Sequence, residues 1–253
     1  MLQRKYLVAH ASFFDLRLKF RVEDAIGRHL YKRGAIERTI TDYLVRSLAI
    51  ADGELAFDVG ANIGWYSLIL DRLAAPSARI FAFEPDPESF ALLEENLAAN
   101  AAARVRPVER ALSDGEGEQA LYRYTAKNSG RHSLVPRAGG EQVRVTVTSL
   151  DAYRSRVGAV GPVAFAKIDV EGWELAVIRG AQQTLSEARL VLVELSPPRM
   201  RAVGHSPEEA IERLFGAGLT PRQVTPGGLV EVARADLLEA RATNTLWVRA
   251  PSR

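Results

Sequence analysis

The stretch LAFDVGANIG, residues 55–64, decides the fold of this chain. Its first half, Leu55–Val59, is a short apolar run that ends at a glycine, which is typical of a buried strand. The residues that follow, Ile63–Leu73, carry apolar side chains at helical spacing. A buried strand, a glycine turn and a helix in this order predict the opening β-α unit of a parallel sheet.

The same alternation continues along the chain. Further core strands are expected at Arg79–Phe83, Val105–Leu112, Val163–Val170, Leu190–Leu195, Leu219–Val224 and Asn244–Val248, and helices at Glu88–Asn100, Trp173–Ser186 and Pro207–Gly216. An extra pair of strands, Ala120–Tyr124 and Gln142–Val147, alternates like exposed antiparallel strands. The pattern predicts an α/β protein: a doubly wound, mostly parallel seven-stranded, Rossmann-like sheet with helices on both faces.

The residues before this sheet have a helical pattern. Apolar side chains recur at helical spacing from Ile36 to Leu48, and Gly53 then breaks the helix. We therefore expect two parts: an N-terminal helical segment, residues 1–52, and a ligand-binding domain, residues 53–253.

Composition excludes several classes of protein. The chain has 253 residues, of which 47% are hydrophobic and 25% charged, as in an ordinary globular domain. It has no cysteine, so disulfides, cysteine-ligated zinc and thiol nucleophiles are excluded. The first residues show no continuous apolar run typical of a secretory signal, and no run is long enough to cross a bilayer. We expect a cytoplasmic protein without a transmembrane segment.

Positive charge is concentrated at the N-terminus. Residues 1–33 carry eight Lys or Arg against three acidic residues, whereas the remainder carries 25 basic and 28 acidic residues. A basic arm could make peripheral contact with a membrane, an anionic substrate or nucleic acid. We favour the alternative, a solvated face of packed helices, and expect no nucleic-acid partner.

Polar side chains follow nearly every predicted strand. In doubly wound sheets, ligands bind beyond the carboxyl ends of the strands. The residues at these ends are Asp58, Gly60, Asn62 and Gly64 for the first strand, Glu84 for the second, Ser113 and Asp114 for the third, Asp169 and Glu171 for the fourth, and Glu194 for the fifth. They predict an acidic ligand site along this edge.

The glycine turn and Glu84 indicate the kind of ligand. Gly60 lets a ligand approach the main chain, and Gly64 permits close packing of the helix. The middle glycine of the dinucleotide motif is missing, which favours a nucleoside without a pyrophosphate, such as S-adenosylmethionine. Glu84, about 20 residues beyond the turn, suits hydrogen bonds from two ribose hydroxyls. Asp114 could accept from the adenine amino group, or belong to a Ser-Asp-Gly turn.

Four strings of sequence carry a specific resemblance. FDVGANIGWYS (57–67), FAFEPDPESF (81–90), ALSD (111–114) and KIDVEGWE (167–174) resemble the FkbM family of S-adenosylmethionine-dependent methyltransferases. The resemblance extends from about Gly34 to the last strand, and Glu37 and Asn244–Leu246 also suit the pattern. It implies a class I methyltransferase fold and O-methylation of a hydroxyl on a sugar, glycan or polyketide-like metabolite.

The resemblance also implies a set of cofactor-binding residues. S-adenosylmethionine, with S-adenosylhomocysteine as product, is expected to contact Asp58, Gly60, Ala61, Asn62, Gly64, Glu84, Pro85, Ser113, Asp114 and Asp169. Trp65 and Tyr66 either wall this pocket or pack in the core. The acceptor is expected to bind between the loop at residues 126–140, the residues after Glu194 and the N-terminal segment.

Catalysis requires alignment of the methyl group and a base for the acceptor hydroxyl. The first candidate base is Asp169, which could instead contact the cofactor's amino group or cap a helix, and Glu171 could share these roles. Glu194 lies on the neighbouring strand, and with Asp169 it could hold Mg²⁺, although two carboxylates fall far short of a ligand set, so no metal ligand is assigned. His132 is a further candidate base or a solvated loop residue.

Three rival functions remain open at this stage. The first is an NAD(P)-dependent oxidoreductase, against which the missing glycine argues. The second is a non-catalytic cofactor-binding protein, and the third is a nucleic-acid methyltransferase that uses the basic N-terminus.

Overall fold

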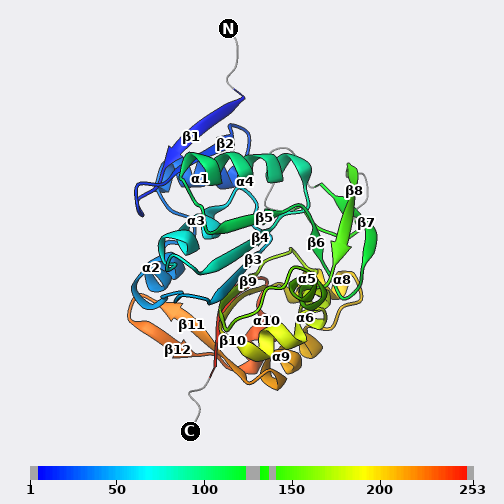
Figure 1. Ribbon diagram of the computed structural model, residues 1–253. Helices are drawn as coiled ribbons and strands as arrows, with labels where there is room; N and C mark the ends of the chain where they lie inside the picture. The colour runs from blue at the N-terminus through cyan, green and yellow to red at the C-terminus, as the bar shows by residue number, and fades with distance from the viewer. Residues whose placement is uncertain (1–4, 124–131, 137–140, 250–253) are drawn as a thin grey trace.

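The computed structural model describes residues 5–123, 132–136 and 141–249 (Figure 1). In chain order the elements are β1 (Tyr6–His10), β2 (Arg17–Arg21), α1 (Ala25–Arg33), α2 (Arg38–Ser47), β3 (Leu55–Val59), α3 (Trp65–Arg72), β4 (Arg79–Phe83), α4 (Pro87–Ala99), β5 (Val105–Val108), β6 (Ala111–Leu112), β7 (Gly117–Tyr122), β8 (Gln142–Thr148), α5 (Leu150–Arg156), β9 (Val163–Ile168), α6 (Glu174–Arg179), α7 (Gln182–Glu187), β10 (Ala188–Leu195), α8 (Pro197–Ala202), α9 (Pro207–Gly216), β11 (Leu219–Thr225), β12 (Gly228–Glu231), α10 (Arg234–Glu239) and β13 (Thr243–Arg249).

The central sheet confirms the predicted α/β architecture. Within the described residues it has eight strands in the order β12-β11-β13-β10-β9-β3-β4-β5. The strands β10, β9, β3, β4 and β5 run parallel to one another, whereas β13 is antiparallel to both β10 and β11. All seven expected core strands are present, and β12 adds an edge hairpin to β11 through a turn at Pro226–Gly227.

Burial on both faces explains why the core strands are nearly continuous apolar runs. In β3, Phe57 and Val59 belong to a hydrophobic cluster that includes side chains of α5, α6 and α9. Ala56, which immediately precedes Phe57, belongs to the cluster formed with α2, α3 and α4. Successive side chains of a strand point to opposite faces, so both faces of the sheet are covered by helices (Figure 1).

Two predicted elements are each divided in the structure. The strand expected at 105–112 is β5 in the central sheet and β6 in a second sheet of the described residues, with the order β6-β8-β7. The charged pair Glu109–Arg110 interrupts the apolar pattern there. The helix expected at 173–186 is α6 and α7, with a break at Gly180, where a Cβ would lie 2.0 Å from the carbonyl oxygen of Ser113.

The prediction of helices throughout residues 1–52 is wrong for the first part of that segment. Tyr6–His10 and Arg17–Arg21 form an antiparallel hairpin, and helices begin only at Ala25. In β2, Leu18 and Phe20 are fully buried, while the basic side chains alternate with them. This period of two is typical of a strand, whereas the helical spacing of apolar residues holds only for residues 36–48.

The hairpin is fixed to the sheet domain by α4. The side-chain amides of Asn96 and Asn100 exchange hydrogen bonds of 2.7–3.1 Å with the backbone of Lys19 and Arg17. Lys19 also pairs with Glu95 at 2.5 Å, so part of the basic N-terminus is neutralised by this helix. The division at residues 52 and 53 stays a prediction. None of the described helices is both long and apolar enough to cross a membrane.

The turn after β3 brings two strand ends into contact. Gly60 has φ +80°, and a Cβ at this position would lie 1.9 Å from the backbone oxygen of Asp169. The Asp169 N–H donates to the Val59 carbonyl at 3.1 Å, which closes β9 onto β3. Gly64 has φ +94° and packs against Leu93 of α4, consistent with the close packing predicted for it.

Replacement of Gly60 by alanine should therefore destabilise the protein far more than replacement of a glycine in open space. We expect Gly60→Ala to lower the free energy of unfolding by about 3 kcal/mol through backbone strain and overlap with the Asp169 carbonyl. Gly53→Ala is the control, since Gly53 has φ +76° with nothing within 4 Å, and should lose about 1 kcal/mol. Equal losses in urea denaturation would contradict this account.

Candidate functional site

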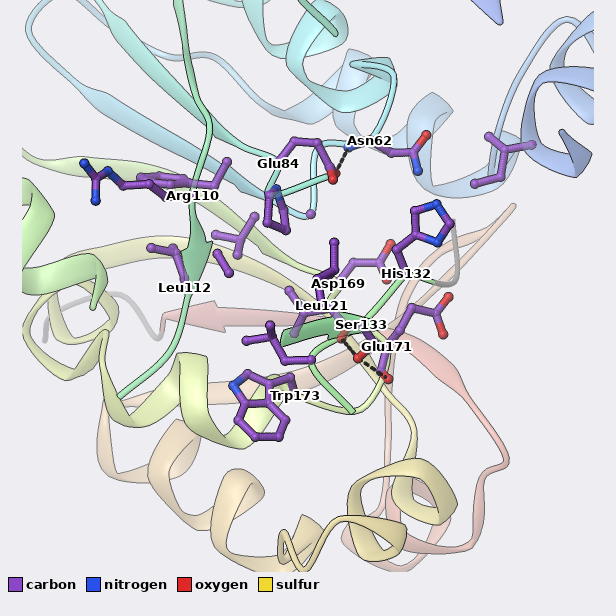
Figure 2. A pocket seen from close by; sticks show the side chains of 18 residues that line it. Asn62, Glu84, Arg110, Leu112, Leu121, His132, Ser133, Asp169, Glu171 and Trp173 are labelled. Atoms are coloured by element: carbon purple, nitrogen blue, oxygen red, sulfur yellow. Dashed lines mark hydrogen bonds between the residues drawn. The ribbon is translucent and has the colours of Figure 1, made fainter. Parts of the chain in front are cut away.

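A cavity opens where β3, β4 and β9 reach their carboxyl ends (Figure 2). It brings together seven residues predicted from the sequence: Gly60, Asn62, Glu84, Pro85, His132, Asp169 and Glu171. Glu84 and Asn62 border it on one side, and Ser133 and Trp173 on the other (Figure 2). The carboxyl edge of the sheet is thus the place of the pocket, as the strand pattern predicted.

Glu84 is a buried carboxylate held by backbone donors. Its Oε2 accepts from the Asn62 N–H at 2.8 Å and its Oε1 from the Asp86 N–H at 2.9 Å. Only 5% of Glu84 is exposed, and burial raises its pKa to about 8 against the opposing effect of these hydrogen bonds. When Glu84 is ionised, each oxygen keeps one lone pair for a further donor, so the carboxylate can then accept hydrogen bonds from a ligand.

Asn62 shapes the turn between β3 and α3. Its backbone has φ 50°, in the left-handed region that asparagine tolerates better than most residues. Its side-chain Oδ1 accepts from the Ile63 N–H at 2.8 Å, while its own N–H donates to Glu84. The turn and the end of β4 are therefore fixed to each other.

Asp169 lies between a cation and a second carboxyl group. Lys167 Nζ is 2.9 Å from Asp169 Oδ2, and Glu194 forms a side-chain hydrogen bond with Asp169. Burial alone would raise the pKa of Asp169, but Lys167, the Glu194 hydrogen bond and Arg199 hold it below its usual value. Burial and the charge of Asp169 raise the pKa of Glu194. Of this pair, Asp169 is the ionised group and Glu194 holds the proton.

The segment that carries His132 is fixed to the same strand end. Ser133 bridges to Tyr122 of β7, and its hydroxyl is 3.0 Å from the Val170 carbonyl and 3.1 Å from the Glu171 carbonyl. His132 thereby reaches the cavity wall, where burial lowers its pKa. The neighbouring residues 124–131 and 137–140 of the expected acceptor loop lie outside the described residues.

Three carboxyl groups near the cavity could in principle hold a cation. Asp169, Glu171 and Glu194 offer oxygens that lie within 4.8 Å of one another. Lys167 is already paired with Asp169, however, and Arg199 forms an ion pair with Glu171. Two cationic side chains therefore neutralise two of the three carboxylates, and this donor set does not fit a divalent metal. We assign no metal ligand here.

Six other predicted residues, all within the described part, do not line the cavity: Asp58, Ala61, Gly64, Ser113, Asp114 and Glu194. Asp58 points to the opposite face of β3 from Val59 and accepts from the Ser67 hydroxyl at 2.6 Å. Asp114 is exposed and lies 3.6 Å from Arg179, because the chain has turned away into the second sheet. Glu194 is adjacent to the cavity through Asp169.

Several residues of the cavity wall were not predicted. Trp173 lines it and donates from Nε1 to the Ser113 hydroxyl at 3.1 Å. Ile26 of α1, Arg110, Leu121 and Leu134 also line it. Apolar wall residues leave no signal in a single sequence, but Trp173, inside the string KIDVEGWE, could have been proposed.

Trp65 and Tyr66 do not line the cavity: Trp65 is buried against Thr41, and the Tyr66 hydroxyl bonds Glu37.

The comparisons with known proteins assign the family. The profile of the Methyltransferase FkbM domain matches residues 58–219. The chain belongs to the FkbM methyltransferase family. It therefore has the class I methyltransferase fold that the resemblance implied, and this membership decides against an NAD(P)-dependent oxidoreductase.

The relatives are similar over most of their length. Hexuronic acid methyltransferase AglP of Haloferax volcanii is 28% identical, over 76% of this chain and 75% of that protein. Methyltransferase sdnD of Sordaria araneosa is 30% identical, over 62% of this chain and 72% of that protein. 31-O-demethyl-FK506 methyltransferase FkbM of Streptomyces tacrolimicus is 27% identical, over 55% and 64%. The solved structure of a SAM-dependent O-methyltransferase of Thermotoga maritima aligns with a TM-score of 0.44 at 13% identity. The alignment covers 87% of this chain and 68% of that protein.

The burial of Glu84 makes the stability of the ligand-free protein depend on pH. Because burial raises the pKa of Glu84 to about 8, the native state keeps a proton that the unfolded state releases near the ordinary value of 4.5. The free energy of unfolding should fall as pH rises from about 5 to 8. In Glu84→Gln this fall should be smaller, measured by urea denaturation at both pH values. Glu94→Gln, at an exposed site on α4, should retain the wild-type fall.

Proposed function

We propose that this FkbM-family protein is an S-adenosylmethionine-dependent O-methyltransferase that acts on a hydroxyl of a sugar, glycan or polyketide-like metabolite. One observation carries the proposal: a buried carboxylate with free lone pairs, Glu84, and an ionised carboxylate, Asp169, border one cavity at the ends of β4 and β9. Isothermal titration with S-adenosylhomocysteine tests it. Binding that is absent, or tight binding of NAD(P)H in its place, would contradict the proposal.

The residues of the cavity fit a nucleoside ligand. Glu84 would accept hydrogen bonds from two ribose hydroxyls, which also favours its ionised form. Gly60 carries no side chain that would separate the ligand from the main chain of the turn. Pro85 and Asn62, which also line the cavity, would contact the same ligand. No pyrophosphate-binding glycine is required for such a ligand.

Asp169 is the proposed base of the transfer. S-adenosylmethionine supplies a methyl group that is activated by the positive charge of its sulfur. Asp169, ionised at the cavity wall, would accept the proton of the acceptor hydroxyl while the oxygen of that hydroxyl gains the methyl group. Glu171 and His132 line the same cavity and remain alternative bases. Glu194, also an alternative, holds a proton beside Asp169 and would have to release it before acting as a base.

The class of acceptor follows from the relatives. One relative is named for a hexuronic acid and another for an O-demethylated FK506, and both names describe methyl acceptors of those proteins. We infer a hydroxylated small molecule or glycan as the acceptor here. The cytoplasmic location and the absence of a nucleic-acid partner expected from the sequence stay predictions, as does the membrane contact of the basic N-terminus.

Loss of the Glu84 carboxylate should weaken cofactor binding. Glu84→Ala removes the acceptor of the ribose hydroxyls, and two lost hydrogen bonds to a charged group should raise the Kd for S-adenosylhomocysteine by about tenfold or more. Isothermal titration measures this. Glu94→Ala, on the exposed face of α4, is the matched control and should leave the Kd unchanged. An unchanged Kd in Glu84→Ala would refute the ribose assignment.

Loss of the Asp169 charge should affect the transfer more than the binding. Asp169→Asn cannot accept the proton of the acceptor, and we expect kcat to fall by about 100-fold or more while the Kd for S-adenosylhomocysteine changes little. Screening of hydroxylated glycans and metabolites with S-adenosylmethionine provides the acceptor for this assay. Equal losses in transfer and binding would make Asp169 a binding residue instead.

A further inference from the structure

Lys167 is a buried cation at the end of β9, behind the cavity. Only 3% of Lys167 is exposed. Its Nζ lies 2.9 Å from Asp169 Oδ2 and 5.2 Å from the centre of the Tyr66 ring. Burial of an ammonium group is costly unless acidic groups and hydrogen bonds compensate for it. The surroundings of Lys167 must therefore provide that compensation.

Glu37 is brought to Lys167 from the N-terminal segment. It immediately precedes α2 in a left-handed conformation, φ 44°, which is uncommon for a residue other than glycine. The Tyr66 hydroxyl donates to Glu37 Oε2, and Asn244 Nδ2 donates to Glu37 Oε1 at 2.5 Å. Contacts from α3 and β13 thus fix this carboxyl group. Glu37 and Asn244 both lie outside residues 58–219, the part matched by the family profile.

The register of the central sheet places the remaining groups of this cluster. Asp58 of β3 pairs with Lys167 of β9, and Glu194 of β10 pairs with Asn244 of β13. Asp58 is 1% exposed, and its Oδ1 has no hydrogen-bond partner among the described residues. We call Glu37, Asp58, Tyr66, Lys167 and Asn244 the anchoring cluster. Its members come from five segments that meet behind Asp169.

The charges of the cluster explain the ionisation of its members. Burial alone would lower the pKa of Lys167, but Asp169, Asp58 and Glu37 raise it above its usual value. Burial raises the pKa of Glu37 and of Asp58, although Lys167 opposes both increases. Lys167 is therefore a permanent cation, and Asp169 is the carboxyl group nearest to it.

We propose that Lys167 is a positioning residue of the methyl transfer, which holds Asp169 as a fixed carboxylate at the cavity wall while the other members of the anchoring cluster hold Lys167. This rests on the proposed function, in which Asp169 receives the proton of the acceptor hydroxyl. The N-terminal segment is then part of the active site through Glu37, although it lies outside the matched domain. A purely structural Lys167 would stabilise the fold without controlling the protonation of Asp169.

Several charged or titratable groups face the Lys167–Asp169 pair, and the experiment must separate Lys167 from them. They are Glu37 before α2, Asp58 on β3, Tyr66 on α3, Glu171 after β9, Glu174 on α6, Glu194 on β10 and Arg199 on α8. Lys167→Met removes the charge of Lys167 and its hydrogen bond to Asp169, and keeps a side chain of similar length. Lys167→Arg, which keeps the charge, is the matched control, and Lys167→Gln replaces Lys167→Met if that variant does not fold.

The test is a pH titration of the Asp169 carboxyl carbon by NMR in ¹³C-aspartate-labelled, ligand-free protein, with the signal identified by its loss in Asp169→Asn. We expect the signal of an ionised carboxylate from pH 5 to 8 in the wild type and in Lys167→Arg. In Lys167→Met the midpoint should rise by at least about one pH unit. A midpoint that does not move, with only a lower Tm, would overturn the proposal, as would an Asp169 that titrates between pH 5 and 8 in the wild type.

The proposed function can fail independently of this inference. If the wild type does not bind S-adenosylhomocysteine, the proposed function fails, whereas the titration still reports on Lys167 and Asp169. If it binds and transfers a methyl group while the Asp169 midpoint is the same in Lys167→Met, only the positioning role is wrong. With an acceptor in hand, Lys167→Met should lose more kcat/KM at pH 6 than at pH 8, and Lys167→Arg should not.

Discussion

The close contact between the ends of β3 and β9 is the constraint on which the site depends. At Gly60 the chain turns so near to the Asp169 carbonyl that no Cβ can be accommodated. The Asp169 N–H, bonded to the Val59 carbonyl, fixes the same junction. From this point the chain leaves β3 towards Asn62 and Glu84 and leaves β9 towards Glu171. One backbone contact thus sets both walls of the cavity, which explains why the glycine turn was the most informative stretch of the sequence.

Electrostatics gives the acidic edge of the sheet two different kinds of carboxyl group. Glu84 is held by backbone N–H groups alone, and burial raises its pKa to about 8, so it is ready to become ionised when hydroxyl donors arrive. Asp169 is held by the cation Lys167, which keeps its pKa low in spite of burial. The surroundings thus raise the pKa of one carboxyl group and lower the pKa of the other. This difference allows two groups of the same chemical type to have distinct roles in one site.

The sequence was sufficient for the succession of core strands and helices along the chain after residue 54, because buried parallel strands and amphipathic helices have distinct periods. It also placed Glu84 and Asp169 correctly at the carboxyl edge. It was insufficient where side-chain direction matters: Asp58 shares its face of β3 with Ala56 and points to Ser67, and Asp114 follows a strand that leaves the central sheet. The hairpin at Arg17–Arg21 was missed although its side chains alternate, and the contact of Glu37 with Asn244, 207 residues away, has no local signal.

The most direct measurement of the central claim is a crystal structure of the protein with S-adenosylhomocysteine. The account predicts the ribose hydroxyls within hydrogen-bond distance of the Glu84 carboxylate and the sulfur on the side of the cavity that Asp169 borders. A ligand bound in this cavity without contact to Glu84, or bound at another place on the molecule, would contradict it.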